Sequence, residues 1–467
     1  MPTTRLSPTE GRAALSLSAI LALRMLGLFM IYPVFAVYAT HLSGATAATI
    51  GLALGIYGLA QAMLQIPFGA LSDRIGRKPV ITVGLVLFAM GSVVAAMADS
   101  IGGVILGRAL QGAGAVGSTI LALGADLTRE ENRTKAMAMI GMTIGMSFAL
   151  AVVVGPPLNR WVGVPGIFWL TAVLALVGIA VLYALVPQPH LIIRHRDTEP
   201  VPALFKRVLS NGELLRLDFG IFVQHAILTA TFLALPLALR QVNDAGAHWL
   251  FYLPILVVAF ILMTPFIVIG EKYRKMKPVF IGAVAAVGLG QLSLLVWHKN
   301  LWAIGAGLLV FFAAFSLLEA TLPSLVSKVA PADSKGTAMG VYSSSQFLGI
   351  FVGGAVGGWV QGVFAPNGLL AVFVLTTGLA VCWLLVAITM PAPRYLASRL
   401  IRIPKIRGRE ERERLNDRLL SIAGVAEAVV VAEEGVAYLK VDNRELDETA
   451  LEAFDTSQSD AIAAQST

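Results

Sequence analysis

Four ionisable side chains lie inside long apolar segments: Arg24, Arg108, His225 and Glu319. A buried cation costs about 2.5–3.5 kcal/mol on membrane-insertion scales, so each arginine must face other protein or water. A carboxyl group in apolar surroundings can bind a proton at neutral pH, and histidine already titrates near there. Glu319 and His225 are therefore candidates for reversible proton binding, and a fixed hydrogen bond to a neighbouring group is the alternative for each.

The composition indicates that the segments around these residues cross a membrane. Hydrophobic residues make up 57% of the 467 residues and charged residues 13%, whereas soluble domains carry about 25% charged residues. Twelve apolar runs are long enough to cross a bilayer as helices, which takes roughly 20 residues each. These runs are 15–39, 49–71, 79–98, 101–126, 136–158, 166–186, 217–239, 249–269, 278–297, 301–327, 337–363 and 367–390. We therefore predict an all-α membrane protein.

Lysine and arginine collect on one side of the predicted bundle. The loops after odd-numbered runs hold only Arg160, Arg240 and Lys299, and most of the other cations lie in the N-terminal tail and the loops after even-numbered runs. Because positively charged loops stay in the cytoplasm, we predict that both termini are cytoplasmic. The net charge of +7 then reflects membrane topology, and we expect no nucleic-acid partner.

The two halves of the chain repeat one another. Pro67-Phe68, before a charged turn, recurs as Pro265-Phe266 before another charged turn, and similar pairs recur at nearly the same offset. A parallel duplication of six spans would leave this pattern. We predict an N-terminal half, a linker, a C-terminal half, a second linker and a tail domain, with bounds 1–186, 187–216, 217–390, 391–398 and 399–467.

The charged turn between the second and third runs predicts a contact between the halves. Asp73 would lie at the cytoplasmic surface, near the start of the eleventh run at Thr337. The N-terminus of that helix would stabilise a carboxylate by about 0.3–1 kcal/mol. Arg77 could pair with Asp126, at the same end of the fourth run. This group would act as a conformational latch, or it would be a static charged rim that fixes topology alone.

Small residues and one further acid have simpler interpretations. Gly51 and Gly55 in the second run, and glycines at the same spacing in the eleventh, permit close contact between helices. Asp218, near the start of the seventh run, is expected at the membrane interface.

Two motifs carry a resemblance to the major facilitator superfamily of secondary transporters. The charged turn matches that family's signature G-x-L-x-D-R-x-G-R-K at Gly69, Leu71, Asp73, Arg74, Gly76, Arg77 and Lys78. The fourth run resembles the family's R-x-x-Q-G-x-G motif at Arg108, Gln111, Gly112 and Gly114. The antiporter motif in the fifth run is partial: Gly155-Pro156 is present, but Ala151 stands where the family has glycine.

This resemblance implies the fold and a role for several residues. It implies two six-helix halves and alternating access, and it assigns Arg108 to a proton-linked or helix-packing site. Arg24 has no motif behind it, so a structural hydrogen bond to a neighbouring helix and a part in proton coupling are equal alternatives. With its small tail domain, the whole chain resembles the YajR type of drug-efflux protein.

The tail domain has an α+β pattern. Strands are predicted at 400–403, 427–432 and 436–441, and helices at 409–422 and 445–454. This is a ferredoxin-like order. The tail resembles heavy-metal-associated domains, but it contains no cysteine, so we expect no metal. Residues 456–467 are small and polar, which is typical of disorder.

These observations favour proton-driven export of small hydrophobic or amphipathic compounds. The chain has no G-x-x-x-x-G-K-[ST] loop and no catalytic constellation in its spans, so we expect neither an enzyme nor a cofactor, with the proton gradient as the energy source. Expected partners are a small-molecule substrate, protons and the lipid bilayer, and the transport unit is expected to be a monomer in the bacterial inner membrane. Two alternatives remain: a proton-coupled uptake symporter, and a membrane sensor that signals through the tail domain.

Overall fold

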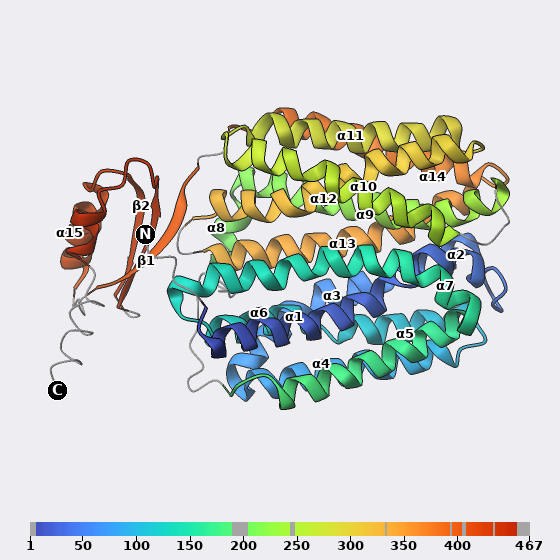
Figure 1. The fold of residues 1–467 in the computed structure, drawn as a ribbon, viewed down its shortest axis with the longest axis horizontal. Coiled ribbons are helices and arrows are strands. Elements are labelled where there is room, and N and C mark those ends of the chain that lie inside the picture. Colours follow the sequence, from blue (N-terminus) through green and yellow to red (C-terminus); the bar gives the residue numbers. More distant parts are fainter. Residues whose placement is uncertain are drawn as a thin grey trace.

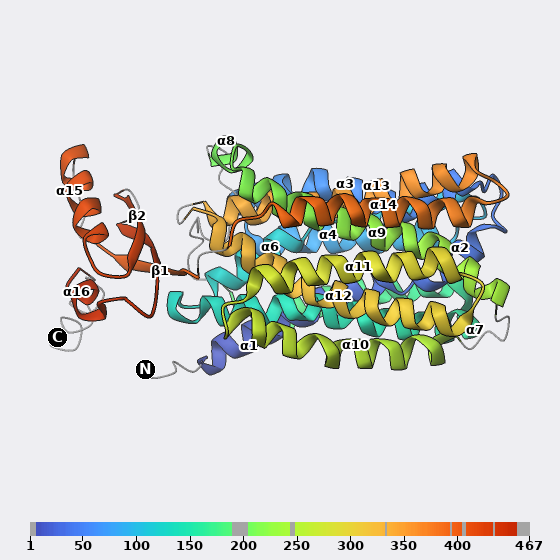
Figure 2. The same ribbon diagram turned by 90° about the horizontal axis from the view of Figure 1, so that it is seen from above.

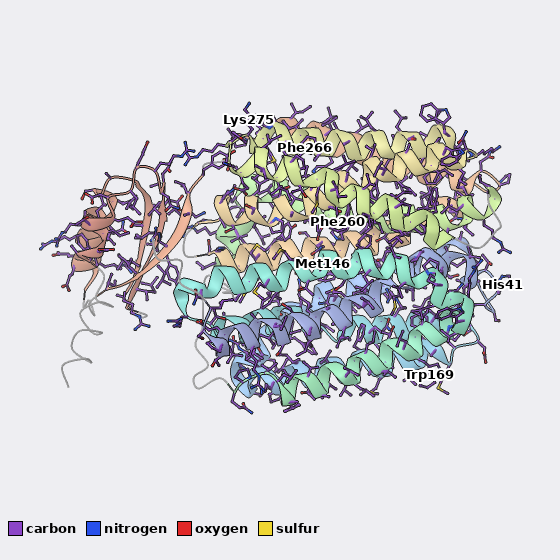
Figure 3. The ribbon with its side chains drawn as sticks, viewed as in Figure 1. His41, Met146, Trp169, Phe260, Phe266 and Lys275 are labelled. Atoms are coloured by element: carbon purple, nitrogen blue, oxygen red, sulfur yellow. The ribbon has the colours of Figure 1, made fainter. Side chains whose placement is uncertain are left out.

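The computed structural model describes residues 6–188, 204–242, 248–331, 334–392, 395–403, 408–432 and 435–454. Long helices lie side by side in one bundle, and the tail domain extends from one end of it (Figure 1). We call this end of the bundle the tail end and the opposite end the far end. Lys275 lies at the tail end and His41 at the far end (Figure 3).

The N-terminal half is built from α1 to α7. Their bounds are Pro8–Phe29, Tyr32–Ala39, Ala47–Ile75, Arg77–Ala96, Ile101–Ala113, Gly117–Asp126 and Glu130–Ala184. A short helix, α8, spans Phe205–Leu209 within the predicted linker. The C-terminal half holds α9 to α14, with bounds Gly212–Val242, His248–Glu271, Met276–Trp297, Leu301–Val329, Lys335–Val363 and Gly368–Ile388.

Eleven stretches of the described chain are long and apolar enough to cross a membrane. One of them lies in α7, whose 55 residues would extend about 80 Å as a straight helix, far more than a bilayer core of about 30 Å. Gly163 interrupts it with φ +69°, a conformation that favours glycine. In Figure 1 the teal arm of α7 runs toward the far end and its green arm runs back toward the tail end, so this helix accounts for two of the twelve predicted crossings.

Two predicted spans are interrupted, and one begins earlier than expected. The first span starts at Pro8 rather than at residue 15. It breaks after Phe29, because Pro33 lacks an amide hydrogen and its ring clashes with the carbonyl four residues earlier. The fourth span breaks between Ala113 and Gly117. This break leaves the carbonyl group of Gly114 available to side chains in the core.

The two halves meet along α3 and α13, and the small residues of these helices make the close helix contacts that we predicted. A Cβ atom on Gly51 would lie 2.2 Å from the carbonyl oxygen of Gly354, and one on Gly55 would lie 2.6 Å from that of Phe351. Gly349 and Gly353 approach α9 just as closely. Larger residues at these positions would force the helices apart.

The tail domain is a three-stranded sheet with two helices. Its elements are β1 (Ala397–Arg402), α15 (Arg409–Leu420), β2 (Val425–Val431), β3 (Val436–Val441) and α16 (Glu448–Glu452). The strand order is β1-β3-β2, and β3 is antiparallel to both neighbours. This split β-α-β arrangement is the predicted ferredoxin-like one. The domain continues beyond the helix ends along the long axis (Figure 2), and the predicted disordered end, 456–467, lies outside the described residues.

Candidate functional site

The charged turn forms a buried ion-pair cluster in the N-terminal half. Gly76, with φ +101°, separates α3 from α4 and lets the chain reverse within one residue. The next residue, Arg77, is 1% exposed; it donates to Asp126 Oδ2 at 2.9 Å and also pairs with Asp73. Arg77 also donates to Ser72 Oγ at 2.7 Å. A guanidinium group held by two carboxylates this far from water is fixed in place.

The other two residues of the predicted latch lie at the edge of this cluster. Arg74 is exposed. Gly69 supplies its carbonyl oxygen to the Ser72 hydroxyl group, which in turn orients Arg77. The predicted pair between Arg77 and Asp126 is thus present, and Asp73 joins it through Arg77.

Arg24 and Arg108 belong to a second polar network, which we call the arginine network. Arg24, fully buried, donates to Gln61 Oε1 at 2.6 Å and to the Gly114 carbonyl oxygen at 3.1 Å. Arg108, also fully buried, donates to Gln111 Oε1 at 2.8 Å. The Tyr57 ring lies between them, with its centroid 5.8 Å from Arg24 Cζ and 5.0 Å from Arg108 Cζ. The ring face stabilises both cations.

The other residues of the R-x-x-Q-G-x-G motif, and Gly155-Pro156 of the partial antiporter motif, allow close helix packing in the N-terminal half. The Gln111 amide group donates to Ser92 Oγ at 2.7 Å, so Gln111 connects Arg108 to α4. A Cβ atom on Gly112 would lie 2.3 Å from the Tyr57 carbonyl oxygen, and one on Gly114 would lie 2.2 Å from that of Gly84. In α7, Gly155 lies equally close to the carbonyl group of Met30, next to Pro156. These glycines allow the helices that carry the arginines to approach one another.

Glu319 and His225 meet in the C-terminal half, in a group that we call the carboxyl network. The Gln346 side-chain amide donates to Glu319 Oε1 at 3.0 Å and contacts His225 Nε2 at 2.9 Å. Gln224 donates to Glu319 Oε2 at 3.0 Å. Three helices therefore converge here: α9 carries Gln224 and His225, α12 carries Glu319 and α13 carries Gln346.

The hydrogen bonds assign a protonation pattern to this network. His225 Nδ1 lies 3.2 Å from the Ile221 carbonyl oxygen, so Nδ1 donates and Nε2 accepts from Gln346. The imidazole ring is then neutral. Glu319 accepts one hydrogen bond on each oxygen, which suits a carboxylate. Its side chain is 22% exposed.

Aromatic side chains from both halves pack against one another beside the carboxyl network. Phe148 of α7 contacts Phe29 of α1 and Phe232 of α9, at centroid distances of 5.0 and 6.3 Å. Phe315, next to Phe148, also contacts the His225 ring at 5.7 Å. The carboxyl network therefore borders an apolar, aromatic contact between the halves.

The tail domain contacts the tail end of the C-terminal half. Lys440 is 1% exposed and donates to the carbonyl oxygens of Ser327 and Lys328, at the end of α12, at 2.9 and 2.5 Å. Burial lowers the pKa of Lys440 to about 8. Arg274 pairs with Asp442 at 2.9 Å, and its hydrogen bond holds the pKa of the Asp442 carboxyl below its usual range.

Known families match both parts of the chain. The family described as Major Facilitator Superfamily matches residues 17–354 and, in a second alignment, 217–424. The chain belongs to the major facilitator superfamily. A second family, the YajR YAM domain, matches residues 399–454, which hold the three-stranded sheet and its helices. The predicted resemblance is thus confirmed.

Individual relatives within the superfamily support this assignment. The inner membrane transport protein YajR of Escherichia coli is 47% identical over 94% of this chain and 96% of its own length. The multidrug resistance protein MdtH of Aeromonas salmonicida is 26% identical over 74% of this chain and 85% of its own. The structure of a bacterial homologue of the human lysosomal transporter Spinster has a TM-score of 0.68 at 14% identity, covering 82% of this chain and 97% of that one.

Superfamily membership makes this chain a multi-pass membrane transporter and not an enzyme. The structure adds partners that sequence reasoning missed, above all Gln61 and Gln346, the amides that join each network together. A glutamine in an apolar membrane span is itself a signal, since an unpaired amide there is costly. Asp218, expected at the membrane interface, lies near the start of α9 as predicted and is 6% exposed, because neighbouring helices cover it.

Proposed function

We propose that this transporter exchanges protons for small hydrophobic or amphipathic compounds, which it exports across the bacterial inner membrane. The tail end would face the cytoplasm, in accord with the lysines and arginines of its loops. The inner-membrane location of the E. coli relative agrees with this proposal. Energy would come from the proton gradient.

The carboxyl network is the observation that carries this proposal. As a carboxylate, Glu319 holds amide donors from α9 and α13 at once. A proton on Glu319 would remove negative charge and weaken both hydrogen bonds, since bonds to an ionised acceptor are the stronger ones. Proton binding would thereby change how tightly α12 is held to α9 and α13, and α13 packs closely on α3 of the N-terminal half.

The arginine network has a different part in this scheme. Guanidinium groups do not lose their proton in proteins, so Arg24 and Arg108 would position helices without carrying the coupled proton. His225 would share the proton of Glu319 transiently, because its Nε2 lies 3.8 Å from Glu319 Oε2. The cluster of Asp73, Arg77 and Asp126 would be the latch that holds one arrangement of the two halves.

The aromatic contact between the halves supports the proposed substrate class. Phe29, Phe148, Phe232 and Phe315 offer ring faces and few fixed polar groups, which suits bulky apolar or cationic compounds. The name of the MdtH relative, a multidrug resistance protein, points the same way. A polar nutrient would need more hydrogen-bonding groups at this place.

Proton movement in reconstituted vesicles tests the proposal. Vesicles would enclose a pH-sensitive dye, and a panel of lipophilic cations including ethidium would be added to wild type, Glu319→Gln and Asp73→Asn. We expect compound-dependent proton movement in wild type, none in Glu319→Gln, and slower but still coupled movement in Asp73→Asn. Compound-dependent proton movement that persists unchanged in Glu319→Gln would exclude Glu319 as the coupling site.

A further inference from the structure

A second buried acid lies between the carboxyl network and the tail end. Asp218 is in the second turn of α9 and is 6% exposed. Among the described residues, neither of its carboxyl oxygens has a hydrogen-bond partner. An ionised carboxylate without partners in apolar surroundings is costly, so this geometry favours the protonated acid.

Tyr342 of α13 is a similarly placed hydroxyl group. It is 3% exposed, and within the described chain its oxygen has no hydrogen-bond partner either. Both Asp218 and Glu319 lie within electrostatic reach of this hydroxyl group. A tyrosine hydroxyl group can donate one proton while accepting another, so it can connect two acids that do not touch.

The helix geometry puts these groups in a line. Asp218 precedes His225 by seven residues, two turns of α9, so both lie on one face about 10 Å apart along the axis. Tyr342 precedes Gln346 by one turn of α13 and shares its face. The two helices run parallel, since Gly349 lies beside Phe222 and Gly353 beside Ala226. Asp218 and Tyr342 therefore both lie on the tail-end side of the carboxyl network.

We propose that Asp218 and Tyr342 form a second proton-binding site, through which Glu319 releases its proton at the tail end. This inference rests on the proposed function, because it needs Glu319 to carry the coupled proton. Asp218 is then a proton acceptor in the transport cycle and not a structural residue. A purely structural acid would be expected to have hydrogen-bond partners that offset the free-energy cost of burying it.

The transfer balances without any further reactant. The O–H bond of the Glu319 carboxyl group breaks, and its proton goes to the Tyr342 oxygen. The Tyr342 hydroxyl proton goes at the same time to the Asp218 carboxylate, where a new O–H bond forms. Asp218 later gives this proton to water at the tail end and returns to its carboxylate form for the next cycle.

Infrared spectroscopy of the full-length protein tests the site without a substrate. A protonated carboxyl group has its own carbonyl stretching band, and we expect Asp218→Asn to remove one such band at neutral pH. Tyr342→Phe should shift that band, whereas Tyr252→Phe should not. Tyr252 is a matched control, because its hydroxyl group is also buried and unpartnered in the described chain but lies near the other end of the bundle. A spectrum of Asp218→Asn identical to wild type would overturn the proposal.

Proton movement driven by ethidium separates this inference from the proposed function. We expect at least a tenfold slower proton release into the tail-end compartment in Asp218→Asn and in Tyr342→Phe, with ethidium binding unchanged. Asp99→Asn, at an exposed far-end position, is the control. Loss of coupling in Glu319→Gln together with normal rates in Asp218→Asn would refute the relay alone. Normal coupling in Glu319→Gln would refute the proposed function itself.

Discussion

The two halves of this transporter each bury a polar network, but the charges differ in kind. The arginine network of the N-terminal half contains two guanidinium groups, Arg24 and Arg108, which stay protonated at any physiological pH. The carboxyl network of the C-terminal half contains Glu319 and His225, which can each gain or lose a proton. The comparison suggests that the two halves have different roles. The N-terminal half keeps a fixed charge and a fixed structure, and the C-terminal half responds to protons.

The partners of each network fit this division. Arg24 and Arg108 donate partly to backbone carbonyl groups, those of Gly114, Ala53 and Leu54, which cannot reorient without moving a helix. Glu319 accepts from the side-chain amides of Gln224 and Gln346, and only the Gln346 amide also contacts His225; both amides can rotate. A rigid network resists change, and an adjustable one can accommodate two protonation states.

The largest expected effect follows removal of a fixed charge. Arg108→Met would leave the Gln111 side-chain oxygen without its charged donor in the core and remove the guanidinium contacts to α3, at a cost on the order of 3 kcal/mol of folding free energy. Thermal unfolding of the purified protein measures this loss. Arg160→Met, at an exposed position, should unfold with wild type. Equal stability of Arg108→Met and wild type would contradict a scaffolding role.

A matched pair of glutamine substitutions compares the networks directly. Gln61→Leu removes one acceptor of the buried Arg24 cation and should cost about 2 kcal/mol, because hydrogen bonds to charged groups are the stronger ones. Gln346→Leu removes a bridge between two groups that can become neutral, and should cost about 1 kcal/mol. Thermal unfolding of both variants shows which substitution costs more folding free energy. The reverse order would place the more rigid network in the C-terminal half.

Neutralising the carboxyl group should affect stability still less. Glu319→Gln keeps a side chain of the same shape, and rotation of Gln224 can restore a hydrogen bond, so we expect a change below about 1 kcal/mol. The variant should therefore fold normally while losing the proton movement described above. A large loss of stability would show that Glu319 is a structural residue like Arg108.

The smallest expected effect is at the tail domain and depends on pH. Lys440 has a pKa of about 8 at the contact, below its ordinary value of 10.5, so the separated domain binds more protons between these values. The contact should not change between neutral pH and pH 8, and it should strengthen as the pH rises above 8. Distances between spin labels at Lys272 and Glu410, both exposed, measure docking in a Cys382→Ser background. Lys440→Met should remove the pH dependence, and a contact that weakens above pH 8 would refute the assignment.

Residue types alone indicated the fold and half of each network. Arg24, Arg108, His225 and Glu319 are conspicuous because ionisable groups are rare in apolar runs. Their partners depend on packing between segments far apart in the chain. Arg24 reaches the carbonyl of Gly114, 90 residues away, because the helix breaks there.

The burial of Asp218 could not be predicted for a related reason. Its place near the start of a span suggested the interface, and only the packing of α9 against α13 and α14 shows that neighbouring helices cover it. Distance along one helix gives depth in the membrane, but exposure depends on which neighbours surround that helix.

The contact between Lys440 and the end of α12 has a mechanical consequence. The helix that carries Glu319 is held at its tail end by the tail domain, which extends beyond the bundle along the long axis (Figure 2). A small tilt of the C-terminal half would therefore move this domain over a larger distance, because displacement grows with distance from the axis of the tilt. The tail domain would therefore move outside the bilayer in each transport cycle, where other molecules could bind it.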